Sequence, residues 1–493
     1  MGGTAARNQI VMTGAGTLNI AGTGTITGGT ISSVAGGYTV LNNGTVNYNG
    51  TTQSIGNYTY YNLSTQNSGI KSLTANTTVL NNLTVNANSI LNLSTFTANR
   101  SSSGGAFTMG DNSTLTVSGA SNFPANFLTY SLANSSTVNY NYASGTQSIS
   151  GQTYCNLTVS GGTKNLTGAT IVNGNLSLTS SLLTLGSYDL TLGATTNVLG
   201  TPGVANMIVA TGTGTLRKYF TSATSFVFPV GDTTGTAEYT PLNIAFSGGT
   251  FASGALVAVK LTDDKHPNVS GTSNYVSRYW TVSQTGITNF SATVTGTIVT
   301  ADLEGFTPSN IITSRYNSNN QEWTDHDAVT ATTISATSIT SFGDFTGRNN
   351  VPTIVSSSTS LTGFTYAYGL GPSSIQSFNV SGSGLNTNIE VLPTDSFEIS
   401  SLDGVSFTAM PLVRLNVLNR EVQSTPVYVR LKAGLPVKAS IVNNLSCIST
   451  NATTVNVSCS GSVTNAPQIE IIPDTLTGFT YNLGSTTSPY QSV

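Results

Sequence analysis

The feature that most constrains this chain is an internal repeat that begins near residue 45. The matching segments are TVNY at 45–48 and 137–140, TQSI at 52–55 and 146–149, and YNL at 61–63 with CNL at 155–157. Lys71 and Lys164 also occupy equivalent positions, 93 residues apart. Self-similarity over such a distance is typical of folds that stack one structural unit on the next.

A shorter rhythm runs inside each copy. Stretches such as STLTVSG at 113–119 and SILNLSTFT at 89–97 place Leu, Val or Ile at every second position, with Asn, Gly or Ser between them. Alternation with period two predicts strands, and the Asn and Gly residues supply turns. No stretch of this region has helical periodicity with caps. We therefore predict an all-β fold that begins with a β-solenoid (parallel β-helix) over 1–200, with aliphatic rows inside and Thr, Ser and Asn rows outside.

The charge content supports this prediction and excludes several kinds of protein. Only 35 of the 493 residues are charged (16 Lys+Arg and 19 Asp+Glu), or 7%, against roughly 25% in ordinary soluble domains. Like charges at equivalent positions of stacked coils would repel one another, which explains the deficit. Without a basic patch, nucleic acid is excluded as a partner. No apolar run is long enough to span a membrane.

The remainder of the chain has a different composition. Aromatic and charged residues gather in 201–349, in strand-like runs such as SFVFPVGD at 225–232 and SRYWTVS at 277–283, which predict a β-sandwich domain. Residues 350–464 repeat this pattern as an immunoglobulin-like sandwich module. LTGFTY at 361–366 recurs at 476–481. We therefore expect 465–493 to begin a second, truncated copy, and the polypeptide to continue into further modules.

These motifs resemble a known family. The unit SLTGFTYAYGLGPSSIQSFNVSGSG with VYVRLKAGLPV and VNVSCSG is similar to a sandwich module found in tandem in cell-surface proteins of Bacteroidetes. Their Asn/Thr-rich solenoid stretches resemble residues 1–200, and FVFPVGD with YTPLNIAF and SRYWTVS resembles another of their domains. The resemblance implies a large adhesin or surface component that is secreted by the type IX route and is extracellular. It provides no catalytic residues to transfer.

Three cysteines are too few for a disulfide framework. Cys447 and Cys459 flank a segment centred on Thr453. If Thr453 is the tip of a hairpin, the two thiols lie opposite each other and are close enough to form a disulfide. The alternative is two unpaired cysteines on neighbouring strands.

The acidic residues decide whether catalysis or metal binding is expected. Residues 1–230 contain no Glu and only two Asp, at 111 and 189, so the solenoid lacks the paired carboxylates of glycan-cleaving enzymes. Farther on, two clusters combine acids with His, and each would bind Ca²⁺ or another metal if the loops converge. The candidate metal ligands are Asp263, Asp264, Asp325 and Asp327. The alternative is that these residues lie in solvated loops and strand ends. We expect no cofactor and no enzymatic activity.

The leading hypothesis is an extracellular structural or adhesive surface protein, with a solenoid stalk and sandwich modules. Its expected partners are surface glycans or other copies of itself. Three alternatives remain open: a carbohydrate-binding or carbohydrate-active β-helix protein, an ice-binding solenoid with flat Thr rows, and a filament subunit that donates edge strands.

Overall fold

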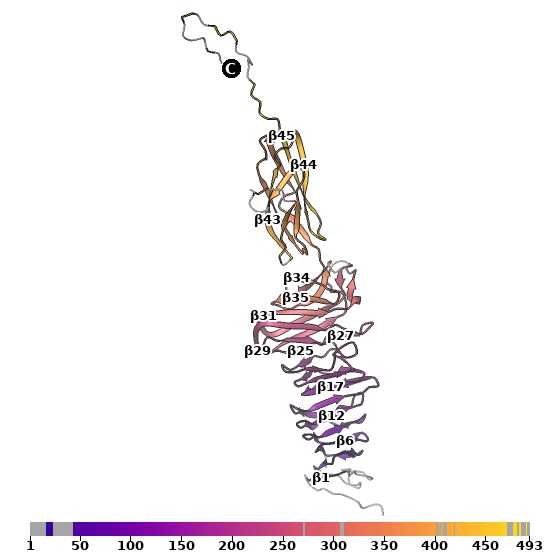
Figure 1. Cartoon of the computed structure of the whole chain (residues 1–493). Coiled ribbons are helices and arrows are strands. Elements are labelled where there is room, and N and C mark those ends of the chain that lie inside the picture. The colour runs from indigo at the N-terminus through magenta and orange to yellow at the C-terminus, as the bar shows by residue number, and fades with distance from the viewer. Residues whose placement is uncertain are drawn as a thin grey trace, which may run out of the picture. The chain divides into compact units, whose positions relative to one another are not determined.

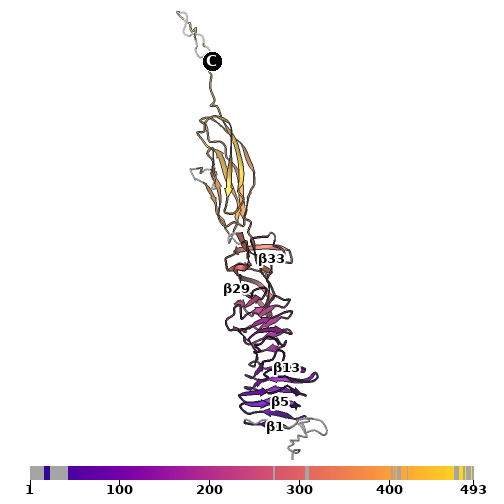
Figure 2. The ribbon, with the colours of Figure 1, turned by 90° about the vertical axis from the view of Figure 1, so that its right-hand side faces the viewer.

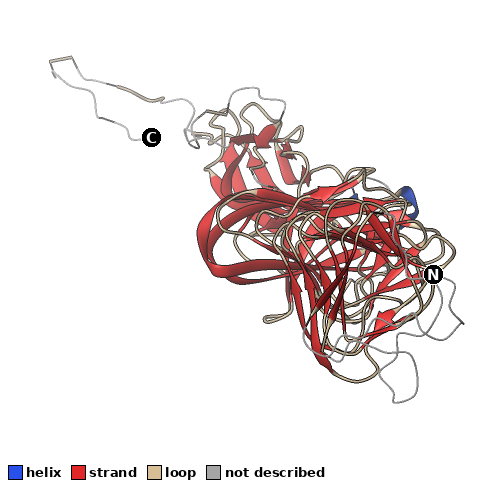
Figure 3. Ribbon diagram, turned by 90° about the horizontal axis from the view of Figure 1, so that it is seen from below, coloured by secondary structure: helices blue, strands red, loops and turns tan. Residues whose placement is uncertain are grey.

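The computed structural model describes residues 16–22, 43–269, 272–305, 310–400, 404, 406–407, 412–418, 420–470, 477–480, 483–484 and 490. The chain divides into two compact units, 1–349 and 350–493, and each contains its own hydrophobic core. Among the described residues, regular structure is strand apart from one 3₁₀ turn, η1 (Thr300–Asp302) (Figure 3). The prediction of an all-β chain is confirmed.

The first unit begins as a solenoid of parallel sheets (Figures 1 and 2). Its first six-stranded sheet contains β1 (Thr17–Ile20), β2 (Thr45–Tyr48), β5 (Asn62–Thr65), β8 (Leu83–Val85), β11 (Gly104–Met109) and β13 (Phe127–Leu132). The eight-stranded sheet contains β3 (Gln53–Ile55), β6 (Ile70–Leu73), β9 (Ile90–Asn92), β12 (Thr114–Val117), β14 (Thr137–Tyr140), β17 (Asn156–Ser160), β20 (Leu176–Thr179) and β23 (Val198–Leu199). A three-stranded sheet contains β4 (Thr59–Tyr60), β7 (Thr77–Val79) and β10 (Ala98–Asn99).

Strand register builds the predicted aliphatic row inside the solenoid. In the eight-stranded sheet the pairing places five buried side chains over one another: Leu91, Leu115, Val138, Leu157 and Leu176. The residues between them point outward, since successive side chains of a strand alternate between the two faces. From β9 to β20 the inner row of this sheet is therefore aliphatic, as expected. At β6 and β3 the same inward position holds Lys71 and Gln53, and the outer face includes Ile70 and Ile90 beside its hydroxyl and amide groups.

The sequence repeat is out of phase with the coils. TVNY forms β2 of the first six-stranded sheet in one copy, but β14 of the eight-stranded sheet in the other. The second copy is thus rotated by one face of the solenoid. Both copies still bury the same polar set: the hydroxyls of Tyr48 and Tyr60 lie 2.9 Å apart, and those of Tyr140 and Tyr154 lie 3.0 Å apart.

Two further sheets continue the solenoid into the rest of the first unit. The second six-stranded sheet contains β15 (Thr146–Ile149), β18 (Thr163–Leu166), β21 (Leu182–Thr184), β24 (Ile208–Val209), β27 (Val230–Asp232) and β28 (Glu238–Tyr239). The eleven-stranded sheet contains β16 (Thr153–Tyr154), β19 (Thr170–Val172), β22 (Leu190–Leu192), β25 (Leu216–Tyr219), β26 (Ser225–Phe228), β29 (Leu242–Thr262), β31 (Tyr279–Thr297), β33 (Ile311–Asn317), β34 (Glu322–Ala328), β35 (Thr333–Ile339) and β36 (Asp344–Asn349). A small pair is formed by β30 (Tyr275–Val276) and β32 (Leu303–Glu304).

The eleven-stranded sheet joins the solenoid to residues 201–349. Strand β25 pairs in parallel with β22 of the solenoid and antiparallel with the long strand β29. One hydrophobic core extends from Val46 to Phe345. The expected boundary between 200 and 201 therefore lies inside a compact unit, whereas the expected boundary at 349 coincides with the division between the two units.

The second unit is a β-sandwich. Its four-stranded sheet has the order β37 (Thr353–Ser356), β39 (Gln376–Ser383), β43 (Val422–Leu431) and β41 (Phe397–Ser400). Its five-stranded sheet has the order β38 (Ser360–Ala367), β45 (Val455–Thr464), β44 (Lys438–Ile448), β40 (Ile389–Leu392) and β42 (Val413–Leu415). Both sheets contribute to one core, in which Phe364 of β38 contacts Phe397 of β41 with ring centroids 5.2 Å apart.

Candidate functional site

The outer face of the eight-stranded sheet presents a continuous row of uncharged polar side chains. Strand pairing places seven hydroxyl or amide residues side by side, which we call the polar row: Ser54, Ser72, Asn92, Thr116, Asn139, Thr158 and Ser177. All are at least partly exposed. Neighbouring strands lie about 4.8 Å apart, so the row repeats its hydrogen-bonding groups at that spacing.

A second row lies beside the polar row on the same face. Its members are Ile70, Ile90, Thr114, Thr137 and Asn156. The paired rows contain hydrogen-bonding groups and methyl groups but no charged side chain, so a ligand can approach without displacing the hydration shell of an ion. Such a face suits an extended partner with regularly spaced hydroxyl groups.

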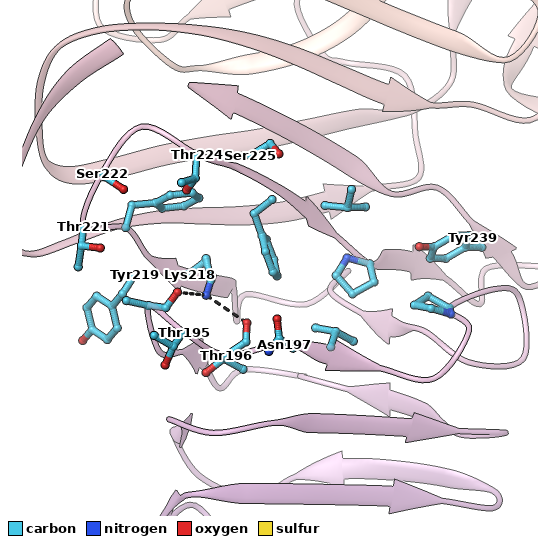
Figure 4. Close-up of a pocket in the computed structure, with 17 residues that line it drawn as sticks. Thr195, Thr196, Asn197, Lys218, Tyr219, Thr221, Ser222, Thr224, Ser225 and Tyr239 are labelled. Carbon is cyan, nitrogen blue, oxygen red and sulfur yellow. Dashed lines mark hydrogen bonds between the residues drawn. The ribbon is translucent and has the colours of Figure 1, made fainter. Parts of the chain in front are cut away.

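A cleft of about 550 Å³ lies where the last coils meet β26 (Figure 4). Its hydroxyl groups belong to Thr195, Thr196, Thr221, Ser222, Thr224 and Ser225. Its aromatic rings belong to Tyr219, Phe220, Phe226 and Tyr239. Rings beside hydroxyl groups are suited to sugars, whose C–H faces stack on aromatics while their hydroxyl groups form hydrogen bonds.

Lys218 is the charged side chain that lines this cleft, and it is already held in place. Its ammonium donates to the carbonyls of Gly193, Ala194 (2.8 Å) and Thr196 (3.2 Å). It also lies 5.1 Å from the centroid of the Phe226 ring. Burial lowers the pKa of Lys218 to about 8. Because its donors are used by the protein, Lys218 orders the cleft and is not available to bind an anionic ligand.

The two lysines of the sequence repeat have the same role. Lys71 donates to the carbonyl of Asn67 at 2.8 Å, and Lys164 donates to that of Tyr142 at 2.9 Å. Both side chains are fully buried, and burial lowers the pKa of each, that of Lys164 to about 8. Both copies of the repeat therefore contain a buried ammonium group that donates hydrogen bonds to backbone carbonyls of the turns.

The strongest electrostatic cluster lies around Arg278, which is fully buried. Its guanidinium contacts four carboxylates: Asp302 at 3.0 Å, Asp232 at 2.5 Å, Asp263 at 3.0 Å and Glu238. Burial alone would lower the pKa of Arg278, but its hydrogen bonds and charge interactions with Asp302 and Asp232 raise it. Burial raises the pKa of Glu238 and of Asp263, and Arg278 opposes both shifts.

Three of these acids lie close enough to be considered for metal binding. Carboxylate oxygens of Asp232, Glu238 and Asp263 lie within 4.8 Å of one another. However, Glu238 and Asp263 both bind the same nitrogen, Nη2 of Arg278. The guanidinium thus occupies the position between the carboxylates that a cation would need. This arrangement fits a buried ion network that ties β27 and β28 to Arg278, the residue just before β31, and it does not fit Ca²⁺.

The structure separates the other predicted metal ligands. Asp264 accepts a hydrogen bond from the backbone of Lys265 and is not in the Arg278 cluster. Asp325 forms a bidentate pair with Arg348, at 2.7 and 2.8 Å, while Asp327 is exposed on the same strand. Among the described residues, neither predicted acid/His cluster forms a metal site.

His266, which follows Asp264 and Lys265 in the sequence, points into the protein. Its ring is buried among Tyr279, Tyr316 and Trp323, at centroid distances of 4.8, 5.1 and 5.0 Å. Its Nε2 lies 3.1 Å from a carboxylate oxygen of Asp344. His266 therefore belongs to the core packing of the first unit.

Cys447 and Cys459 are free and buried, so of the two alternatives the structure shows unpaired cysteines on neighbouring strands and no disulfide. Cys447 pairs with Val455, and Cys459 pairs with Asn443. The turn is centred on Asn451, which adopts φ 64°, and not on Thr453. This shift of two residues at the turn separates the cysteines by four positions in register, too far for a disulfide. Burial raises the pKa of each thiol to about 11.

A scan against protein-family models finds no match, and neither does a search of curated proteins. Over the residues that the structure describes, no helix has the length and hydrophobicity needed to cross a bilayer.

Sequence reasoning missed the Arg278 network, although the signal was present. Asp232 and Arg278 lie in two of the strand-like runs singled out in the sequence, SFVFPVGD and SRYWTVS. In a chain with so few charges, an Arg and an Asp inside apolar strands indicate a buried pair. The lysines of the repeat carried a similar signal, because each lies within a strand at the equivalent position of its copy, in an otherwise uncharged segment.

Proposed function

We propose that this chain is a non-enzymatic, extracellular structural and adhesive surface protein that attaches to glycans. The observation that carries the proposal is the polar row, seven hydroxyl or amide side chains in register on one face of the solenoid. The backbone holds these groups in place before contact, so binding loses little side-chain entropy. Many weak hydrogen bonds repeated along one axis favour a long polysaccharide over a small ligand.

The proposal is supported by what the buried charges do. Arg278 and its acids satisfy one another within the first unit, and the lysines satisfy turn carbonyls. These groups hold the fold together, so the outer face of the eight-stranded sheet is left to uncharged hydrogen-bonding side chains. A location at the cell surface is consistent with the resemblance to Bacteroidetes surface proteins.

The test places charge in the polar row. We expect the Thr116→Lys/Thr158→Lys variant to lose about tenfold or more in affinity for insoluble polysaccharides, because each ammonium must be desolvated on contact. The matched control is Ser148→Lys/Asn165→Lys, which adds the same charge to outward positions of the second six-stranded sheet. Retention on cellulose and chitin, together with a glycan array, gives the readout. Equal binding by both variants, or no glycan bound by the wild type, would contradict the proposal.

The cleft beside Lys218 favours a second candidate function, the recognition of a short saccharide. Phe226 and Tyr239 supply ring faces, and Thr221 and Ser222 supply hydroxyl groups. Phe226→Ala should abolish binding of a soluble oligosaccharide in titration calorimetry while leaving retention on insoluble polysaccharide unchanged. If loss of Phe226 affects both equally, the cleft and the polar row are parts of one site.

Ice binding is an alternative to glycan binding, because the polar row and its neighbour include Thr side chains at regular spacing. Thr114 and Thr116 on β12 continue as Thr137 and Asn139 on β14, so two rows run in register. A thermal hysteresis measurement separates the alternatives. Freezing-point depression by the wild type that is lost in Thr116→Lys/Thr158→Lys would favour ice over glycan.

A further inference from the structure

The second unit exposes apolar side chains at the end where the chain leaves β45. Three of them form what we call the distal pole: Tyr368 (52% exposed), Leu370 (69%) and Val437 (48%). Strand register brings them together, since Ala367 pairs with Thr464 and Lys438 pairs with Val463. The amide of Tyr368 donates to the carbonyl of Thr464 at 2.9 Å. The patch therefore surrounds the point at which the chain continues to Asn465.

The opposite end of the sandwich has apolar side chains as well. There Thr353 pairs with Ser383, and Val351 and Leu418 are 66% and 74% exposed. Arg420, two residues after Leu418, donates to the carbonyl of Gly384 at 3.0 Å, so Leu418 lies near this end. We call Val351 and Leu418 the proximal pole. The module thus exposes apolar side chains at both of its ends, so the two ends of successive modules could pack against each other.

The sequence repeat fixes how far apart two such modules can lie. LTGFTY recurs after 115 residues, so the counterpart of Thr353, where β37 begins, is Gln468. Strand β45 ends at Thr464. Only the three residues 465–467, Asn-Ala-Pro, remain between the modules, and three residues span at most about 10 Å. The connector before the first module, 350–352, is Asn-Val-Pro, of the same length and with proline at the same position.

We propose that the distal pole is the docking surface for the module that begins at residue 465. The short connector with its fixed proline brings the start of that module, where Ala466 stands at the position of Val351, onto Tyr368, Leu370 and Val437. Burial of these side chains links successive modules end to end and stiffens the array. This proposal is independent of glycan binding by the solenoid and rests on the register of the sandwich and on the repeat.

The test completes the second module from the chain's own sequence. Since Val493 aligns with Phe378, we would fuse residues 379–464 after Val493 and compare the product with the 493-residue chain. Hydrogen exchange at the amides of 368–370 should slow by about tenfold in the fusion. Leu370→Asp should restore fast exchange and broaden the distribution of dimensions in small-angle scattering. The matched control is Val442→Asp, a residue that is also exposed but lies mid-strand, paired with Ser460.

Unchanged exchange at 368–370 in a fusion whose second module is folded would overturn the proposal. An equal effect of Val442→Asp would also overturn it, because that site lies away from the pole. If the fused segment shows no protected strands, residues 350–464 are instead placed directly after Thr464. That second fusion duplicates a module with a complete core and keeps the three-residue connector, and the same two outcomes apply to it.

Discussion

At the residue scale, several of the few charged side chains are buried, although removal of a charge from water costs free energy. Lys71, Lys164 and Arg278 are fully buried, and Lys218 nearly so. Burial of a charge is tolerated only when its donors are satisfied. The lysines meet this requirement with turn carbonyls, whereas Arg278 meets it with carboxylates. Substitution of a buried charge should therefore lower the free energy of unfolding more than substitution of an exposed one.

Arg278→Met should destabilise the first unit strongly. Without the guanidinium, Asp232 and Asp302 remain buried with no counter-charge, which costs about 3–5 kcal/mol. The measurement is urea unfolding followed by tryptophan fluorescence, since Trp280 lies two residues away on β31. The control is Arg217→Met, which breaks the partly exposed pair with Asp189 and should cost about 1 kcal/mol or less. Similar losses in both variants would mean that the network is weak.

The buried lysines and tyrosines predict a maximum of stability near pH 10. Lys164 and Lys218 have a pKa of about 8 in the folded state, below the usual 10.5. Between these values the unfolded chain binds more protons, so stability should rise with pH, by about 3 kcal/mol or less for each lysine. Burial raises the pKa of Tyr140 and Tyr154 above 10. Their contribution is therefore lost above pH 10, and stability should fall again.

Unfolding midpoints in urea between pH 7 and 11 measure this profile. Lys164→Met and Lys218→Met should flatten the rise between pH 8 and 10 while leaving the fall above pH 10 in place. A wild-type profile that declines steadily from pH 7 would show that the lysine ammonium groups are fully stabilised by their carbonyl partners.

At the element scale, alternation of apolar and polar residues was sufficient to predict the solenoid strands, but not their register. Leu157 and Thr158 show why the pattern works: adjacent residues of β17 point to opposite faces. The rotation of the second repeat by one face could not be predicted, because it depends on how many strands separate the copies. The turn at Asn451 is similar. Because the turn lies two residues before Thr453, Cys447 and Cys459 are four positions apart in register and cannot form a disulfide.

Leu157→Ala and Thr158→Ala compare the two faces of one strand. Leu157 is fully buried in the aliphatic row, so its truncation leaves a cavity and should cost about 2–5 kcal/mol. Thr158 belongs to the polar row, and its truncation should change stability by about 0.5 kcal/mol or less. Chemical denaturation of the first unit measures both values. A cost for Thr158→Ala close to that of Leu157→Ala would mean that the outer face is structural and would weaken its assignment to binding.

At the scale of the whole molecule, the boundary at 349 was predictable, whereas the continuity across 200 was not. The composition changes beyond 200 because the parallel coils end at β27 and the strands that follow pair antiparallel. Composition does not reveal that β25 pairs with both β22 and β29. That shared sheet joins two compositionally different segments into one compact unit. The Arg278 network was missed for the same reason, since its members come from four segments of this unit that are distant in sequence.

The two separate cores predict two unfolding transitions in calorimetry. Residues 201–349 should melt together with the solenoid, because one core extends across both segments. Leu157→Ala should lower only the first unit's transition. Val429→Ala, at a fully buried position of the second core, should lower only the other, each by several degrees. If residues 201–349 gave a third transition insensitive to both variants, the shared sheet would not couple them. If one transition responded to both variants, the two units would unfold as a single cooperative body.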